Sequence, residues 1–175
     1  MTTLRIVTAQ INPVVGDIEG NTDKILNAVE QAMQAHNPQL ILFPELVVTG
    51  YPPEDLLLRS SISHRVERAL ARIAKAAKET YIVIGYPRSR EQGLYNTAGV
   101  FYRGRLLHEY HKQCLPNYRV FDEKRYFKEG RESVVFDLFG VPTAVSICED
   151  IWQDGPTAAA RAAGAQLMLN MSASP

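Results

Sequence analysis

This chain has few cysteines and no net charge, and both shortages narrow the class of protein. There are only two cysteines, Cys114 and Cys148, and one tryptophan. A chain of this size without an export signal normally keeps its thiols reduced, so each cysteine needs its own explanation. The 19 basic and 19 acidic side chains cancel, which leaves no net field to hold nucleic acid or an anionic membrane.

A long hydrophobic run is also missing at the N-terminus. Thr8 and Gln10 interrupt the opening segment MTTLRIVTAQI, which is too short and too polar for a secretory signal or a membrane-spanning helix. We therefore predict a cytoplasmic protein without a membrane partner. The phosphate-binding motifs G-x-x-x-x-G-K-[ST] and G-x-G-x-x-G are absent as well, so no nucleotide cofactor is expected in this chain.

A metal site is not expected either. His108, His111 and Cys114 follow an H-x-x-H-x-x-C pattern. On a strand, however, an offset of three residues places the two histidines on opposite faces, so one metal ion could not bind both. Cys114 is therefore interpreted as a packed loop residue.

Strands and helices alternate along the first half of the sequence, which is typical of a layered α/β domain. The expected strands are residues 4–11, 39–43 and 81–86, and the expected helices run from an N-cap at Asn21 to about residue 36 and from 61 to 78. The hydrophobic content of 46% is enough for a single core in 175 residues.

The second half adds antiparallel pairing, so a mixed sheet is predicted. Strands over residues 95–102 and 105–111 form a hairpin at Arg103-Gly104, and a polar loop covers residues 112–132. Further strands at 133–139, 143–147 and 166–171 flank a short helix between Pro156 and Gly164. The last strand would leave an uncovered sheet edge, so we expect a fragment or a truncated chain.

Three strand ends carry side chains with a coherent chemistry. Glu45, Lys112 and Cys148 each follow an apolar strand, and residues at the carboxyl ends of strands in an open α/β sheet can converge on one crevice. A carboxylate can deprotonate a thiol, and a lysine ammonium can stabilise the oxyanion of a tetrahedral intermediate. The combination indicates acyl transfer from an amide or a nitrile.

Each of these residues also has a plain structural interpretation. A cysteine at a strand end is more often a small buried hydrophobe than a nucleophile. A glutamate after Phe-Pro is usually a turn or helix-start charge, and a lysine that closes a hairpin strand is usually solvated. Spacing alone therefore leaves the function open.

Four motifs in order narrow the choice: FPELVVTGYPPEDLLLR, HKQCLPNYRVFDEKRYF, SICEDIW and NMSASP. Together they resemble the carbon-nitrogen hydrolase (nitrilase) superfamily, and more narrowly the glutaminase domain of the glutamine-dependent NAD synthetase family. The superfamily pattern is only a Glu, a Lys and a Cys in that order, whereas TGYPPEDLL and NYRVFDEKRYF are typical of the narrower family. The match extends from Thr8 to Pro175, which is essentially the whole chain.

The resemblance implies a role for each of four catalytic residues. Glu45 is the expected general base, Lys112 the stabiliser of the tetrahedral intermediate, and Cys148 the nucleophile that forms a glutamyl thioester and releases ammonia. Glu123 matches a second family glutamate, which would orient Lys112 and shuttle protons.

The resemblance also implies how glutamine is held. The backbone N–H of Glu149 would be a second oxyanion donor. Its carboxylate, with Tyr51 and Tyr118, would bind the amino-acid end of glutamine, and Phe121 would shape the pocket.

For the protein as a whole, the resemblance implies an α-β-β-α sandwich with a mixed sheet, in which residues 1–175 are a partial glutaminase domain truncated on its C-terminal side. In that family an ATP-using synthetase domain in the same chain takes the ammonia and amidates deamido-NAD, so ATP and Mg²⁺ are expected there and no cofactor here. An oligomer of identical chains is also implied. Two alternatives stay open: a stand-alone amidase or nitrilase with another small substrate, and an inactive truncated module.

Overall fold

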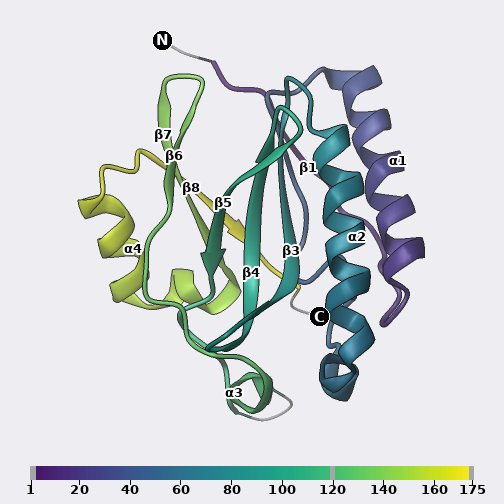
Figure 1. Cartoon of the computed structure of the whole chain (residues 1–175). Helices are drawn as coiled ribbons and strands as arrows, with labels where there is room; N and C mark the ends of the chain where they lie inside the picture. The colour runs from purple at the N-terminus through teal and green to yellow at the C-terminus, as the bar shows by residue number, and fades with distance from the viewer. Residues whose placement is uncertain (1–2, 119–120, 174–175) are drawn as a thin grey trace.

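Two β-sheets pack face to face between helices in a computed structural model that describes residues 3–118 and 121–173 (Figure 1). Helices α1 and α2 lie on one outer side, and α4 lies on the other. The predicted α-β-β-α sandwich with mixed pairing is therefore confirmed. Residues 119–120 of the second motif and 174–175 of the last lie outside the described residues.

The larger sheet has five strands in the order in which they occur along the chain. The first three strands are parallel, and β3, β4 and β5 pair in antiparallel fashion. The β4–β5 turn lies at Arg103-Gly104, where both residues have positive φ angles of 49° and 76°, as a tight two-residue hairpin requires. The strands are β1 (Ile6–Thr8), β2 (Leu40–Leu42), β3 (Tyr81–Arg90), β4 (Gly93–Tyr102) and β5 (Arg105–His111).

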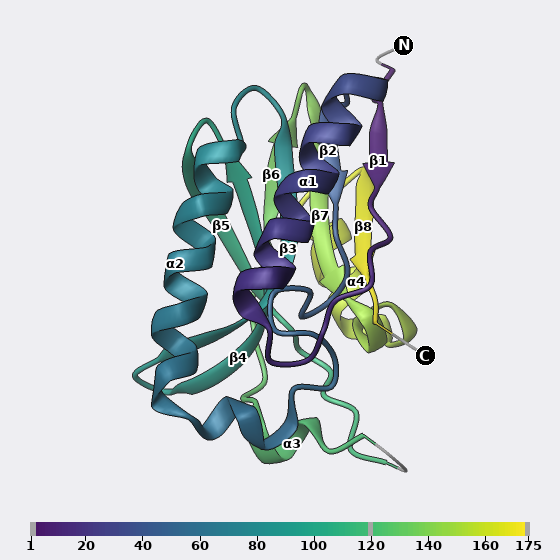
Figure 2. The same ribbon diagram turned by 90° about the vertical axis from the view of Figure 1, so that its right-hand side faces the viewer.

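Two long helices cover the outer face of this sheet (Figure 2). Apolar residues at spacings of three and four give each helix a buried stripe, which packs with Ile41, Ile82 and Ile84 of the sheet. No helix within residues 3–118 and 121–173 is both long and apolar enough to cross a membrane. The helices are α1 (Ile18–His36) and α2 (Ser60–Ala76).

A three-stranded sheet packs against the inner face of the first one. Its central strand, β7, pairs antiparallel with β6 and parallel with β8. Val83, Val100 and Tyr110 of the larger sheet share a core with Phe136 and Ile147 of the smaller one. The elements of this layer are β6 (Val135–Leu138), β7 (Val141–Ile147), α4 (Asp154–Ala162) and β8 (Leu167–Met171).

The start of α1 corrects one prediction. Asp17, not Asn21, caps the helix, because the Asp17 side chain accepts a hydrogen bond from the Gly20 backbone N–H. Asn21 is fully buried within the first turns, where its side-chain amide pairs with both backbone groups of Val14 and with the carbonyl of Val48. It therefore holds the helix against the loop after β2 and does not cap the N-terminus of the helix.

Several boundaries also differ from the predictions. Strand β3 continues through Pro87 to Arg90, because its later residues pair with the start of β4. The predicted strand over residues 4–11 is reduced to Ile6–Thr8, and the helix expected to start near Pro156 starts at Asp154. The loop 112–132 contains a short helix, α3 (Glu123–Tyr126), and two 3-10 turns also occur, at Glu54–Leu58 and Cys148–Trp152.

Candidate active site

The topology brings the ends of β2 and β5 to one edge of the larger sheet. Because β2 and β3 are parallel and two antiparallel pairings separate β3 from β5, all three strands run in the same direction. Glu45 follows β2 and Lys112 follows β5, so both reach this edge. Glu123, the first residue of α3, joins them there.

Lys112 lies between two carboxylates in the interior of the protein. Its Nζ is 2.7 Å from Oε1 of Glu45 and 2.9 Å from Oε1 of Glu123. All three residues are buried, with exposed fractions of 1% for Lys112, 2% for Glu45 and 6% for Glu123. Charges that are this well buried need such pairing, because an isolated ion would lose its hydration without compensation.

The cluster sets the protonation of its members. Burial alone would lower the pKa of Lys112, but the charges and hydrogen bonds of Glu45 and Glu123 outweigh it and hold that pKa above its ordinary value. Burial raises the pKa of Glu123 to about 7, against the opposing effect of Lys112 and with a contribution from Glu45. Lys112 thus stays a cation, while Glu123 exchanges a proton near neutrality.

Close backbone packing positions both sides of this cluster. The N–H of Lys112 donates to the carbonyl of Asn96, and the Lys112 carbonyl accepts from Gly130. A Cβ atom on Gly130 would lie 2.0 Å from the His111 carbonyl oxygen, and one on Gly85 would lie 2.3 Å from the Leu46 nitrogen. Only glycine allows the chain to approach so closely at these two positions.

Cys148 lies at the end of β7 in an unusual backbone conformation. Its φ is +47°, a region that non-glycine residues rarely adopt and that is frequent at functional sites. The residue is partly exposed, and the Ser172 hydroxyl lies 3.7 Å from its Sγ. The thiol is therefore presented at a turn, at the margin of the core between the two sheets.

Asp150 clamps that turn to the segment that carries Lys112. It is fully buried, and one of its oxygens accepts from the N–H groups of Gln113 and Cys114 at 3.1 and 2.7 Å. The other oxygen accepts from the Tyr110 hydroxyl at 2.7 Å and from the Ile147 N–H at 3.1 Å. The sequence did not single out this residue, although an acid two positions after a strand-end cysteine was a visible signal.

Tyr51 connects the thiol with the charged cluster. Burial, then the charges of Glu123 and Glu45, raise the pKa of Tyr51, and the charge of Cys148 adds to the effect. The phenol therefore lies within electrostatic range of both the thiol and the charged cluster. Tyr51 also lines a cavity of about 570 Å³, together with Phe121 and Glu123.

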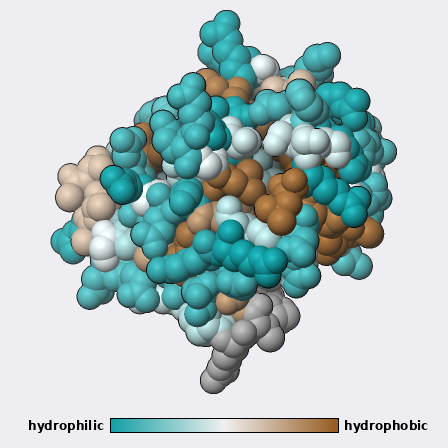
Figure 3. Space-filling view, turned by 60° about the horizontal axis from the view of Figure 1, so that its bottom comes forward, coloured by the Kyte–Doolittle hydropathy of each residue, from teal (hydrophilic) through white to brown (hydrophobic). Residues whose placement is uncertain are grey.

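The remaining predicted binding residues form a group beside this cavity. The Tyr118 hydroxyl donates to Oε2 of Glu149 at 3.0 Å, and the Tyr118 and Phe121 rings meet edge to face at 5.7 Å between centroids. The end of the molecule that carries α3 faces the viewer in Figure 3, where hydrophobic residues gather within a hydrophilic surround. Tyr118 thus contacts both Phe121 and Glu149, and Phe121 lines the cavity together with Tyr51.

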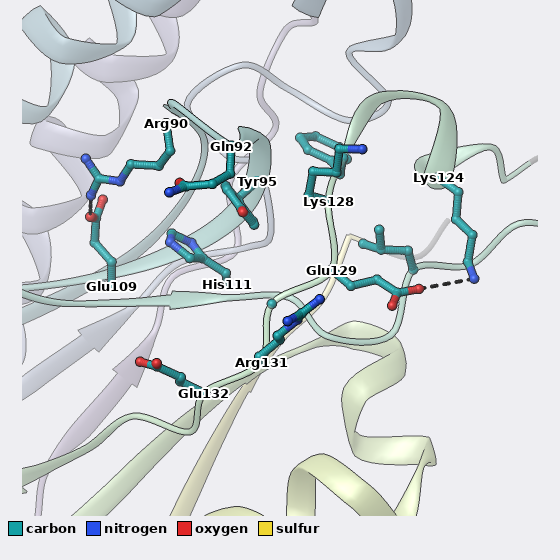
Figure 4. Close-up of a pocket in the computed structure, with 13 residues that line it drawn as sticks. Arg90, Gln92, Tyr95, Glu109, His111, Lys124, Lys128, Glu129, Arg131 and Glu132 are labelled. Carbon is teal, nitrogen blue, oxygen red and sulfur yellow. Dashed lines mark hydrogen bonds and ion pairs between the residues drawn. The ribbon is translucent and has the colours of Figure 1, made fainter.

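A larger cavity, of about 920 Å³, lies next to the β4–β5 strands and the loop after α3 (Figure 4). None of Glu45, Lys112, Glu123 and Cys148 lines it. Its charged walls largely pair with one another, as in Arg90–Glu109 and Lys124–Glu129. We therefore place the chemistry at the smaller cavity, which Glu123 of the buried cluster lines.

Asn96 is the second residue of the site that the sequence did not reveal. It lies fully buried in β4, and its Nδ2 donates to Oε1 of Glu45 at 2.8 Å. Because β4 runs opposite to its neighbours, a residue near its start lies at the edge where β3 and β5 end. An asparagine in a mostly apolar strand, LYNTAGVF, was the available signal.

The histidines of the H-x-x-H-x-x-C pattern lie on opposite faces of β5. His108 stacks near Phe136 of the smaller sheet, whereas His111 stacks on Tyr95 and contacts the Thr97 hydroxyl at 2.8 Å. Within the described part of the chain, no cluster of three or more His, Cys, Asp or Glu residues is arranged to hold a metal ion.

Comparison with known sequences supports one family. A family model described as carbon-nitrogen hydrolase matches residues 5–175. The glutamine-dependent NAD(+) synthetase of Xanthomonas campestris is 45% identical over 99% of this chain, and that of Aquifex aeolicus is 41% identical over 98%. The chain spans about a third of the length of these relatives, 32% and 30% respectively.

Solved structures show the same fold. Glutamine-dependent NAD+ synthetase from Acinetobacter baumannii matches 98% of this chain with a TM-score of 0.94 and 38% identity, over 32% of its own length. An amidase from Nesterenkonia matches 97% of this chain with a TM-score of 0.87 and 27% identity, over 64% of its own length. A variant of that amidase carries acrylamide on its active-site cysteine.

Proposed function

Because the chain belongs to the carbon-nitrogen hydrolase family, we propose that it hydrolyses the side-chain amide of glutamine through a thioester on Cys148. The observation that carries the proposal is the buried Lys112 ammonium. It has three N–H donors, of which Glu45 and Glu123 take two. Within the described part of the chain the third has no acceptor, so it can hold the oxyanion that forms when a thiolate attacks an amide.

The first half reaction forms the thioester. Glu45 accepts the proton of the Cys148 thiol, and Sγ attacks the amide carbon to give a tetrahedral oxyanion. Lys112 and the backbone N–H of Glu149 stabilise that negative charge. The C–N bond then breaks as the nitrogen takes up the proton, and ammonia leaves.

The second half reaction releases glutamate. A water molecule gives a proton to Glu45 and attacks the thioester carbon, and a second tetrahedral oxyanion forms at the same donors. The C–S bond breaks, and the proton returns to the thiolate of Cys148. Glu123 orients Lys112 throughout, and its pKa of about 7 suits proton exchange with the cluster.

The amino-acid end of glutamine has matching groups beside the cavity. The Glu149 carboxylate, which Tyr118 orients, suits an α-ammonium group, and Tyr51 and Phe121 line the approach. This charge distinguishes glutamine from simple aliphatic amides, which have no cation to offer.

The relatives suggest where the ammonia goes. Two of them are glutamine-dependent NAD(+) synthetases of which this chain spans about a third. We infer that a synthetase domain in the same polypeptide uses the ammonia to amidate deamido-NAD. ATP and Mg²⁺ would act in that domain, and no residue described here is assigned to them.

Mass spectrometry of the chain after incubation with glutamine tests the thioester. We expect a glutamyl adduct on Cys148, and the second cysteine provides a matched control. Burial, with the charge of Asp150, raises the pKa of Cys114 to about 11, so this thiol is a poor nucleophile at neutral pH. The adduct should persist in Cys114→Ala and disappear in Cys148→Ala; a folded chain that never acquires it would contradict the proposal.

A stand-alone amidase is the second candidate, because the Nesterenkonia amidase shares the fold over most of this chain. The substitution Glu149→Gln distinguishes a glutaminase from an amidase that acts on another substrate. If glutamine is the substrate, KM for glutamine should rise while any hydrolysis of propionamide stays unchanged. Cleavage of propionamide with glutamine inert would favour the amidase, and inertness toward both would favour a module without activity.

A further inference from the structure

Asn96 occupies a position at which a β-strand rarely holds such a residue. It is fully buried in β4, and asparagine is depleted in strands because its amide must find partners there. One partner is Glu45, which accepts from Asn96 Nδ2 at 2.8 Å. Only the nitrogen of the amide can face this carboxylate, because the amide oxygen would repel it.

The Asn96 side chain also forms a hydrogen bond that lowers the pKa of Glu123, but its amide oxygen adds nothing to the stability of the fold. Within the described residues, its Oδ1 is buried without a hydrogen-bond partner, and the same holds for Oε2 of Glu123. An orphaned buried acceptor costs about 1–3 kcal/mol. A chain that keeps such a residue has another use for it, because an apolar side chain would avoid the cost.

Both hydrogen bonds that the described residues make to the Glu45 carboxylate end on the same atom. Oε1 accepts from Asn96 Nδ2 at 2.8 Å and from Lys112 Nζ at 2.7 Å. Two donors on one oxygen fix the rotation of the carboxylate and occupy that oxygen. The other oxygen, Oε2, accepts no hydrogen bond from the described residues and is free to take a proton.

We propose that Asn96 is a positioning residue that, together with Lys112, occupies Oε1 of Glu45 and so makes Oε2 the atom that takes the proton from Cys148. This inference rests on the proposed function, in which Glu45 is the base. Asn96 also positions the lysine, because its backbone carbonyl accepts from the Lys112 N–H at 2.8 Å. One residue of β4 therefore fixes both partners of the charged pair.

Alkylation of Cys148 by iodoacetamide tests the inference without any need for glutamine. The chain should carry Cys114→Ala, so that a single thiol reacts, and near-UV circular dichroism should verify the fold of each variant. We expect Asn96→Leu to slow alkylation roughly tenfold at neutral pH, the effect of one lost hydrogen bond to a charged group. Glu45→Gln should slow it at least as much, and the double variant should be no slower than Glu45→Gln.

A second variant covers the case in which Asn96→Leu does not fold. Asn96→Asp keeps the shape and can donate to Oε1 only while it is protonated. Its alkylation rate relative to wild type should therefore fall as the pH rises, whereas a purely structural role would give a constant ratio.

The outcomes distinguish a failure of the positioning role of Asn96 from a failure of Glu45 as the base. If Glu45→Gln slows alkylation but folded Asn96→Leu reacts like wild type, or if Asn96→Asp shows a constant ratio, the positioning role is wrong and the proposed base is retained. If Glu45→Gln itself has no effect, both are overturned.

Discussion

Two ion clusters in this molecule differ in charge and in burial: one has an anion between two cations at the surface, and the other has a cation between two anions in the interior. At the surface, the Glu19 carboxylate lies between the guanidinium groups of Arg65 and Arg68, and its side chain is 52% exposed. In the interior, one Lys112 ammonium lies between two carboxylates whose side chains are at most 7% exposed. Water screens the charges of the first cluster far more than those of the buried second cluster, so the same chemistry has different consequences for stability.

The pKa values show this difference. The hydrogen bond from Arg65 lowers the pKa of Glu19 to about 2, so this carboxylate stays ionised at any physiological pH. Burial instead raises the pKa of Glu123 to about 7. The surface cluster therefore acts as a fixed set of charges, whereas the interior one can exchange a proton, as the proposed reaction requires.

Removal of the interior cation should have the largest effect. Lys112→Met leaves two carboxylates buried without a counter-ion and should lower the free energy of unfolding by about 3–5 kcal/mol. It should also abolish the glutamyl adduct on Cys148. Urea denaturation measures the first effect, and a loss below about 1 kcal/mol would show that water reaches the cluster.

Glu123→Gln should change the pH dependence of stability. Because the pKa of Glu123 is raised in the folded state, the native chain binds more protons than the unfolded chain between pH 4.5 and about 7. The stabilisation from this group is present below pH 4.5 and is lost as the pH rises through 7.

Thermal or urea unfolding across this range checks the sign. The free energy of unfolding of wild type minus that of Glu123→Gln should fall by up to about 3 kcal/mol as the pH rises, and then stay level. Glu19→Gln is the control. Because the pKa of Glu19 is lowered in the folded state, the free energy of unfolding of wild type minus that of Glu19→Gln should rise as the pH increases through the acid range. A flat difference for Glu123→Gln would mean that this carboxyl group titrates as it does in the unfolded chain.

Asp150→Asn should have a somewhat smaller effect on stability. The substitution turns an amide NH₂ toward backbone N–H donors and removes the charge that they surround, which costs about 1.5–3 kcal/mol. Asp150 holds the turn at Cys148 against residues 113–114. In the variant, the ratio of the alkylation rate of Cys148 to that of Cys114 should therefore also decrease. Unchanged urea denaturation would show that the backbone donors find other partners.

The surface cluster should show the smallest effect. A double-mutant cycle on Glu19 and Arg65 should give a coupling energy of about 0–1 kcal/mol, and 1 M salt should reduce it further. The same salt should leave the effect of Lys112→Met nearly unchanged. A coupling above about 2 kcal/mol would contradict the distinction between the two clusters.

The main features of the fold could be predicted from local patterns. The periodic helices, the parallel strands between them and the hairpin at Arg103-Gly104 depend on residues that are close in sequence. The boundary of α1 could not, because Asp17 and Asn21 are both good capping residues. Contacts with Val14 and Val48, on the neighbouring loops, decide that Asn21 is buried within the helix.

Of the candidate site, the sequence by itself determined which chemical groups are present: a carboxylate, an ammonium and a thiol, each after a strand, in motifs that resemble one family. Only the tertiary structure decided how these groups meet, since Glu45 and Lys112 are 67 residues apart and touch through the direction in which their strands run. Asn96 and Asp150 escaped prediction for the same reason. Most of their partners lie on distant segments, and hydrogen bonds between distant segments leave no periodic pattern in the chain.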